Sequence, residues 1–177
     1  MNQTPSLGTK EDTRSKVHID ASSVKEATVV MSGIFNAPRE IVWTAFTEPK
    51  HVVHWYGGHG FSNPVCEMDV RPGGTWHHVM RTPDGSEHTL DFVYVEVKKP
   101  EKLVWQNKDY GKRLPGKPPN RHMTVTLDEL GNRTKWTLVA RFDSFADRDL
   151  SVQMGFARMI EQGSEKLDDL VKGLAER

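Results

Sequence analysis

The chain has 177 residues, of which 36% are hydrophobic and 27% are charged, as expected for one globular domain with its own core. Its 24 Lys and Arg residues balance 24 Asp and Glu residues, which argues against nucleic acid or an anionic membrane as the main partner. The single cysteine, Cys66, excludes an internal disulfide and is compatible with the reducing cytoplasm, where we expect the protein to lie.

The N-terminal residues are polar and charged, and they lack the apolar stretch of a signal peptide. Up to about residue 22 there are too few large apolar side chains to offset the entropy lost on ordering. We therefore predict a disordered tail over residues 1–22 and a single domain over residues 23–177.

The domain begins with a predicted strand and one or two short helices. Val24–Phe35 is rich in β-branched residues, which favours a strand. We expect Asn36 to cap the helix that follows, because Pro38 is tolerated in a first helical turn. Pro49 ends this helix, and Lys50–Tyr56 could form a second one.

The middle of the chain alternates between apolar runs and turn signals, which predicts antiparallel strands. The expected strands are Phe61–Arg71, Thr75–Arg81, Glu87–Lys98, Lys102–Asn107, Arg121–Asp128 and Arg133–Phe142. Lys108–Asn120 is rich in Pro, Gly and Lys, which predicts a long irregular loop. Whether this loop is a lid or only a solvated connection stays open.

The pattern becomes helical from Asp147 onwards. Apolar or small residues recur four and three residues apart, which marks one face of a long helix. They are Phe156, Ile160, Gly163, Leu167, Leu170 and Leu174. The order of elements predicts an α+β fold in which about six to seven antiparallel strands curve around the C-terminal helix.

The register of the hairpin around Pro72-Gly73-Gly74 decides which of its side chains face inward. A two-residue loop would mix polar and apolar residues on both faces, whereas a three-residue loop places Val70 opposite Trp76 and makes one face almost wholly apolar. The second register predicts that Trp76, His78 and Met80 point inward and that Asp69, Arg71 and His77 point outward.

Several motifs together resemble the bacterial heat-shock-protein-90 ATPase activator homologue family, within the START-like or SRPBCC superfamily of helix-grip proteins. They are "FNAPREIVWTAFTEPKHVVHWYGGHGF" (Phe35–Phe61), "DVRPGGTWHHVM" (Asp69–Met80), "PDGSE" (Pro83–Glu87) and "YVEVKKPEKLVW" (Tyr94–Trp105). The resemblance runs from about residue 24 to the end of the chain. The resemblance implies a hydrophobic cavity between sheet and helix. Members of the superfamily bind lipids, sterols, hormones or polyketides, and a few are cyclases or hydrolases.

This sequence departs from the family pattern at three positions that bear on the cavity. Tyr56 follows Trp55 where many relatives carry a second Trp, Gly58 stands where a Pro usually ends that run, and Ser164 follows Gly163 where a Trp is common. These differences alter the cavity walls, so a relative's ligand cannot be carried over to this chain.

Aromatic residues are the main candidates for lining such a cavity, because ligand pockets are mostly apolar with a few placed polar groups. We expect Trp43 and Trp136 to fill the core instead. Gly163 has two open interpretations: it admits a close approach of the sheet, or it leaves a gap for a ligand. The predicted cavity-lining residues are Trp55, Trp76, His78, Met80, Tyr94, Phe156, Ile160 and Gly163.

The sequence supports neither a metal site nor a catalytic nucleophile. The spacing of His51, His54 and His59 matches no standard zinc pattern, and no cysteine accompanies them. Cys66 is predicted to face apolar neighbours, which would keep its thiol protonated and inert. We predict no cofactor and no catalytic residues.

Three functions are therefore considered. The preferred one is binding of an unidentified hydrophobic or amphipathic small molecule in the cavity. The family name suggests a chaperone-interacting stress protein instead, although the eukaryotic activators carry an additional domain. The third is an enzyme acting on a polycyclic or polyketide-like substrate through His78 with Tyr94 or Glu96.

Overall fold

The computed structural model describes residues 16–110, 112 and 118–177. Its strands are β1 (His18–Asp20), β2 (Thr28–Phe35), β3 (Ser62–Met68), β4 (Thr75–Arg81), β5 (Glu87–Lys98), β6 (Lys102–Asn107), β7 (Arg121–Leu130) and β8 (Arg133–Phe142). Its helices are α1 (Arg39–Thr47), α2 (Pro49–Trp55), α3 (Phe145–Gln153) and α4 (Phe156–Ala175). The strands and helices predicted between residues 24 and 142 are all present, with small differences at their ends.

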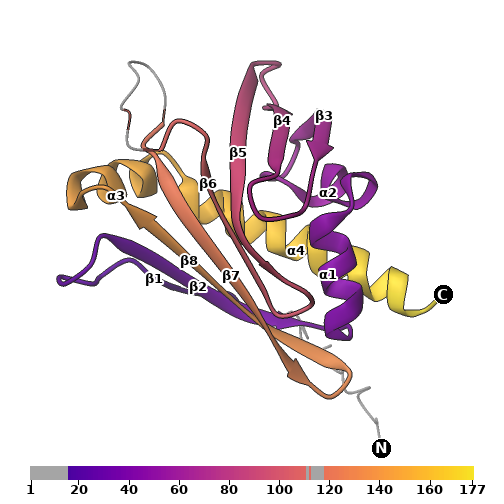
Figure 1. Cartoon of the computed structure of the whole chain (residues 1–177). Coiled ribbons are helices and arrows are strands. Elements are labelled where there is room, and N and C mark those ends of the chain that lie inside the picture. The colour runs from indigo at the N-terminus through magenta and orange to yellow at the C-terminus, as the bar shows by residue number, and fades with distance from the viewer. Residues whose placement is uncertain (1–15, 111, 113–117) are drawn as a thin grey trace, which may run out of the picture.

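All strands of the described residues belong to one antiparallel sheet with the order β1-β2-β8-β7-β6-β5-β4-β3. The sheet curves around α4, while α1 and α2 pack beside the C-terminal half of that helix (Figure 1). In the pairing of β5 with β6 the register shifts between Tyr94 and Glu96, and such a bulge bends a sheet locally. The predicted α+β helix-grip fold is confirmed, with eight strands instead of six or seven.

The additional strand, β1, corrects the predicted boundary of the N-terminal tail. Its residues pair antiparallel with β2, with Ile19 opposite Met31. Backbone hydrogen bonds to a sheet edge order this segment despite its polar composition. The remainder of the predicted tail, residues 1–15, lies outside the described residues, as does part of the Lys108–Asn120 loop.

The helical C-terminal region is two helices and not the single one predicted from Asp147. The Ser144 side chain caps α3 by accepting a hydrogen bond from the backbone N–H of Asp147 at 3.1 Å. Gly155, with φ of 91°, then separates α3 from α4. Because that left-handed conformation is easily adopted only by glycine, Gly155 allows the chain to change direction before α4 begins.

The predicted helix cap at Asn36 is wrong. Pro38 occupies the N-cap position of α1, and no side chain caps it. Asn36 instead contacts α4: its backbone N–H donates to Asp168 Oδ1 at 2.9 Å, and its side-chain amide donates to both oxygens of that carboxylate at 3.3 Å. Asn36 therefore ties the start of α1 to α4.

The β3–β4 hairpin has the predicted faces but a different register. Met68 pairs with Trp76, and the backbone N–H of Asp69 donates to Thr75 O at 2.8 Å, so the loop has five residues and not three. The register thus differs by two residues, and a shift of two keeps every side chain on its face. Gly73 N–H donates to Tyr94 O at 2.8 Å, which fixes the longer loop against β5.

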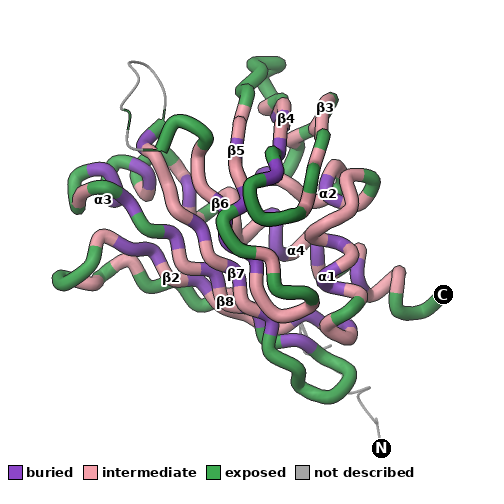
Figure 2. Tube along the Cα trace, in the orientation of Figure 1, coloured by how far each residue is buried: buried purple, intermediate pink, exposed green. Residues whose placement is uncertain are grey.

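The core lies between the concave face of the sheet and the helices. Buried positions alternate along β4, β7 and β8 and follow the inner stripe of α4 (Figure 2). Trp43 is 5% exposed and belongs to this core, as predicted. The buried surface continues into the cavity described next.

Candidate ligand-binding site

A cavity of about 60 Å³ lies between the sheet and α4. Apart from Tyr56, Arg121 and Ser164, its walls are apolar or glycine. It is lined by Phe35, Phe46, Trp55, Tyr56, Gly57, Trp76, Phe92, Trp105, Arg121, Met123, Val125, Trp136, Leu138, Phe156, Met159, Ile160, Gly163, Ser164 and Leu167. This composition is typical of a small-molecule site, although the enclosed space is small for one.

Strand pairing explains why large side chains gather at this position. Trp76 lies opposite Phe92 on β4 and β5, and Trp105 lies opposite Met123 on β6 and β7. Directly paired residues project from the same face of a sheet, so these side chains form a continuous wall. Residues of α4 close the cavity from the other side.

A second, larger space of about 550 Å³ adjoins the cavity; we call it the outer groove. It lies between the β4–β5 hairpin and the junction of α3 and α4, and its volume is in the range of small-molecule sites. It is lined by Phe61, Met80, Thr82, Glu87, His88, Thr89, Leu90, Pro118, Arg121, Ser151, Met154, Gly155, Phe156 and Met159. Arg121, Phe156 and Met159 line both spaces and therefore stand between them.

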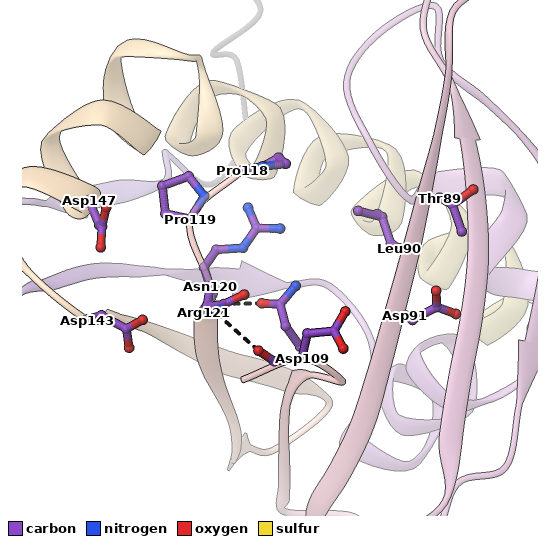
Figure 3. Close-up of a pocket in the computed structure, with 11 residues that line it drawn as sticks. Thr89, Leu90, Asp91, Asp109, Pro118, Pro119, Asn120, Arg121, Asp143 and Asp147 are labelled. Atoms are coloured by element: carbon purple, nitrogen blue, oxygen red, sulfur yellow. Dashed lines mark hydrogen bonds between the residues drawn. The ribbon is translucent and has the colours of Figure 1, made fainter. Parts of the chain in front are cut away.

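Arg121 also lines a third, more polar pocket of about 60 Å³ (Figure 3). Its backbone N–H donates to Asn107 Oδ1 at 2.8 Å, which fixes the start of β7. Its side chain extends away from Asp109 and Asp143 (Figure 3). The guanidinium carbon lies 4.8 Å from the centre of the Phe156 ring. The guanidinium is thus directed to the passage between the outer groove and the cavity.

The structure brings five of the eight predicted cavity-lining residues to the cavity. They are Trp55, Trp76, Phe156, Ile160 and Gly163. Met80 lines the outer groove instead. His78 and Tyr94 are 0% and 2% exposed, and neither is among the residues lining the cavity or the groove.

His78 belongs to a hydrogen-bond network that fills both of its ring nitrogens. Trp76 Nε1 donates to His78 Nδ1 at 3.3 Å, and His78 Nε2 lies 2.7 Å from Asn63 Oδ1. The Asn63 amide donates to Val53 O at 2.9 Å and to Tyr56 O at 3.0 Å, which leaves its oxygen to accept from His78. His78 is therefore a neutral, structural residue that connects β3 and β4 to the end of α2.

The structure does not bring His78, Tyr94 and Glu96 together as the catalytic group that the sequence suggested. His78 has no free ring nitrogen, and burial lowers its pKa to about 4. Tyr94 is buried, and its hydroxyl has no hydrogen-bond partner among the described residues. Glu96 is exposed and pairs with Lys102 at 2.9 Å. These three side chains have no shared site at which a substrate could react.

Burial also controls the remaining ionisable groups near the cavity. It raises the pKa of the Cys66 thiol to about 11, as the predicted inward orientation requires. It raises the pKa of Tyr56 to about 12, an effect that the nearby charge of Arg121 partly opposes. Tyr56 thus keeps a neutral hydroxyl and is one of three polar residues in the cavity wall, with Arg121 and Ser164.

Gly163 both admits a close approach of another segment and lines the space for a ligand, the two interpretations that the sequence left open. The segment that approaches it is not the predicted one. A Cβ atom at this position would lie 3.2 Å from Trp55 O and 3.3 Å from Gly57 O. The close approach is therefore made by the end of α2 and the segment after it, and not by the sheet. The same glycine also lines the cavity.

Other residues weighed from the sequence lie elsewhere. Asp69 and Arg71 form an exposed ion pair at 2.8 Å, as their outward orientation predicted. His51 lies near Glu48, and His59 pairs with Glu165 at 3.0 Å. Across residues 16–110, 112 and 118–177 no three His, Cys, Asp or Glu side chains converge as metal ligands would.

Sequence reasoning missed several residues of the site. Trp136 is 3% exposed and belongs to the core, as predicted, but it also lines the cavity and stacks on Phe35 at a ring distance of 5.5 Å. Arg121 was not recognised, because a charged residue opening a strand is usually solvated. The signal that could have found it is its position two residues before Met123, on the inward face of β7.

A curved antiparallel sheet that encloses a long C-terminal helix, with an apolar cavity between them, defines the helix-grip, START-like class of proteins. Within this class the chain belongs to the family described as "Activator of Hsp90 ATPase homolog 1-like protein", which matches residues 36–172. No curated protein matches the sequence. None of the described helices is long and apolar enough to cross a membrane.

Solved structures with the same fold cover most of the chain. A protein from Nitrosomonas europaea is 23% identical, with a TM-score of 0.78 over 88% of this chain and 99% of its own. A protein from Arthrobacter aurescens is 21% identical, with the same TM-score over 88% and 91%. An AHSA1-like protein from Aeromonas hydrophila is 16% identical, with a TM-score of 0.63 over 80% and 93%. At these identities the likeness shows the fold alone.

Proposed function

We propose that this protein binds a hydrophobic or amphipathic small molecule between the sheet and α4. The observation that carries the proposal is an aromatic-lined cavity that meets a 550 Å³ groove at Phe156 and Met159. A ligand in the groove would contact apolar side chains of Phe61, Leu90 and Met154. Methionine and phenylalanine side chains at the passage can change rotamer and admit an apolar group to the cavity.

The proposal is tested with Nile red, a neutral dye whose fluorescence rises in apolar surroundings. We expect saturable binding, together with a change in tryptophan fluorescence, because Trp55, Trp76, Trp105 and Trp136 all line the cavity. Native mass spectrometry of freshly purified protein should also detect co-purified small molecules. Absence of any saturable dye binding would refute the proposal.

The family description favours a second function, stimulation of a heat-shock-protein-90 ATPase. This would involve a chaperone partner and not a small molecule. The test is the ATPase rate of purified chaperone with and without the protein. An unchanged rate at saturating protein would dispose of this function while leaving ligand binding untouched.

Both functions suit a protein of the cytoplasm. The sequence has one cysteine and therefore no internal disulfide, which is compatible with a reducing compartment. Locating a tagged copy in fractionated cells tests this part of the proposal.

A further inference from the structure

The Arg121 side chain has no ion-pair partner in the part of the chain that the structure describes. Its Nε is buried and has no hydrogen-bond acceptor among the residues that the structure describes. Within the same residues no ion pair joins the guanidinium to a carboxylate, and its carbon lies 4.8 Å from the centre of the Phe156 ring. Buried charges are normally paired, so this arginine is an exception that needs a reason.

Other partly buried arginines in this chain do have polar partners. Arg148 donates to Asp149 Oδ1 at 2.9 Å and to Ser23 O at 2.6 Å. The Nε of Arg39 likewise has no hydrogen-bond partner among the described residues, but its guanidinium lies 3.7 Å from Glu129 and 4.0 Å from Glu101. Arg121 thus differs from them in that its guanidinium, at the passage between the outer groove and the cavity, has no carboxylate partner among the described residues.

Acidic residues do line the neighbouring pocket, but they do not neutralise Arg121. Asp91, Asp109 and Asp143 line that pocket, and no ion pair among the described residues joins them to the guanidinium (Figure 3). On the side of the outer groove the acidic residue is Glu87, which pairs with Arg81 at 2.6 Å. The guanidinium therefore keeps its charge available toward the groove.

Two nearby features would also favour a negative group at the passage. Tyr56, whose neutral hydroxyl can donate a hydrogen bond, lines the cavity within the electrostatic influence of Arg121. Helix α4 begins at Phe156, directly beside the guanidinium, and no side chain caps its N-terminus. A helix N-terminus favours a negative group, so it supports the same kind of ligand as the arginine does.

We infer that Arg121 binds the carboxylate of an amphipathic ligand whose apolar part lies against the aromatic cavity and the apolar side chains of the outer groove. This inference rests on the proposed function and assigns the chemical class of its ligand. A guanidinium binds a carboxylate through two parallel hydrogen bonds. A carboxylate fits better than a phosphate because Arg121 is the only Lys or Arg among the described residues lining the two spaces, so one positive charge faces one negative charge.

The test compares ligands with the same chain and different head groups. Decanoate, decanol and decyl phosphate are each titrated against Nile red bound to the wild-type protein, and the dissociation constant of each is derived from its displacement curve. We expect decanoate to bind at least about tenfold more tightly than decanol, as a charge-assisted pair implies. Equal binding of decanoate and decanol would overturn the inference while leaving the proposed function intact. Tighter binding of decyl phosphate would overturn the assignment to carboxylates.

Variants connect this preference to the arginine. Within each of the variants Arg121→Gln and Arg121→Met, decanoate should bind no better than decanol. Arg121→Lys should keep most of the preference, and Arg141→Gln, on the neighbouring strand and exposed, should be unchanged. If all three Arg121 variants lose Nile red binding, the residue is structural and the inference is refuted. If wild type binds neither Nile red nor any of the amphiphiles, the proposed function fails together with the inference.

Discussion

His78 Nε2 and Asn63 Oδ1 lie 2.7 Å apart, and this contact joins the middle of β4 to the start of β3. The geometry requires a proton on Nε2, because Nδ1 accepts from the Trp76 indole. A second proton on the ring would remove that acceptor and place a charge in the core. The network therefore holds only while His78 is neutral.

The neutral state of His78 makes stability depend on pH. Burial lowers its pKa to about 4 from 6.5, so between these values the unfolded chain binds a proton that the folded protein does not. The free energy of unfolding should be constant above pH 6.5 and fall as the pH decreases from 6.5 to 4. We expect His78 to contribute a loss of about 2 kcal/mol between pH 7.5 and about pH 5, measured by urea unfolding.

The control for this prediction is His78→Gln, which cannot titrate. It should be less stable at neutral pH but lose less stability than wild type on acidification. Burial also lowers the pKa values of His51 and His122, so the difference between wild type and variant isolates His78. Parallel pH curves for the two proteins would contradict the prediction.

Asn63→Ala should destabilise the fold by about 2 kcal/mol or more, because it leaves His78 and two backbone carbonyls without partners. Chemical unfolding at neutral pH measures this loss. Asn132→Ala, in the exposed turn between β7 and β8, is the matched control and should change stability by less than about 0.5 kcal/mol. A similar loss in both variants would show that the Asn63 network adds nothing to stability.

Asp168→Ala should cost about 1–2 kcal/mol, because the carboxylate accepts hydrogen bonds from Asn36 and pairs with Lys172 at 2.8 Å. Its neighbour Asp169 is exposed, so Asp169→Ala is a control with the same charge change. In a double-mutant cycle, Asn36→Ala should have a smaller effect once Asp168 is absent. Additive effects would mean that the contact between α1 and α4 contributes no coupling.

The strand pattern of this protein could be predicted from sequence because local signals and burial agree there. Alternating apolar residues and turn residues predicted the first and last residues of β4, β5, β6 and β8 correctly. The inward-facing side chains of β4 were also predicted, because successive residues of a strand alternate between its two faces. The loop length was wrong, because it depends on the hydrogen bond between Gly73 and Tyr94, which are distant in sequence.

The site was less predictable because its polar groups are defined by tertiary contacts. His78 looked like a ligand-binding group, but its hydrogen bonds to Asn63 and Trp76 use its nitrogens. Arg121 looked like a surface charge, and only the packing of α4 against β7 buries its Nε. A sequence shows which residues face inward, but not which of their polar atoms find a partner.

Cys66 should react slowly with thiol reagents in the folded protein. Burial raises its pKa to about 11, so at neutral pH its thiolate is about 100-fold less abundant than that of an ordinary cysteine. The rate of modification by a disulfide reagent should therefore rise about 100-fold or more when the protein is unfolded in urea. Comparable rates in both states would show an accessible, reactive thiol.

Met159→Trp should weaken Nile red binding by about tenfold or more, because a larger side chain would fill the passage between the outer groove and the cavity. The control is Met154→Trp at the outer rim of the groove, where the methionine is 63% exposed and a larger side chain has room. Dye titrations of both variants, after circular dichroism has verified their folds, make the comparison. Equal affinities would place the dye in the groove alone, whereas selective loss in Met159→Trp would show that its apolar part reaches the cavity.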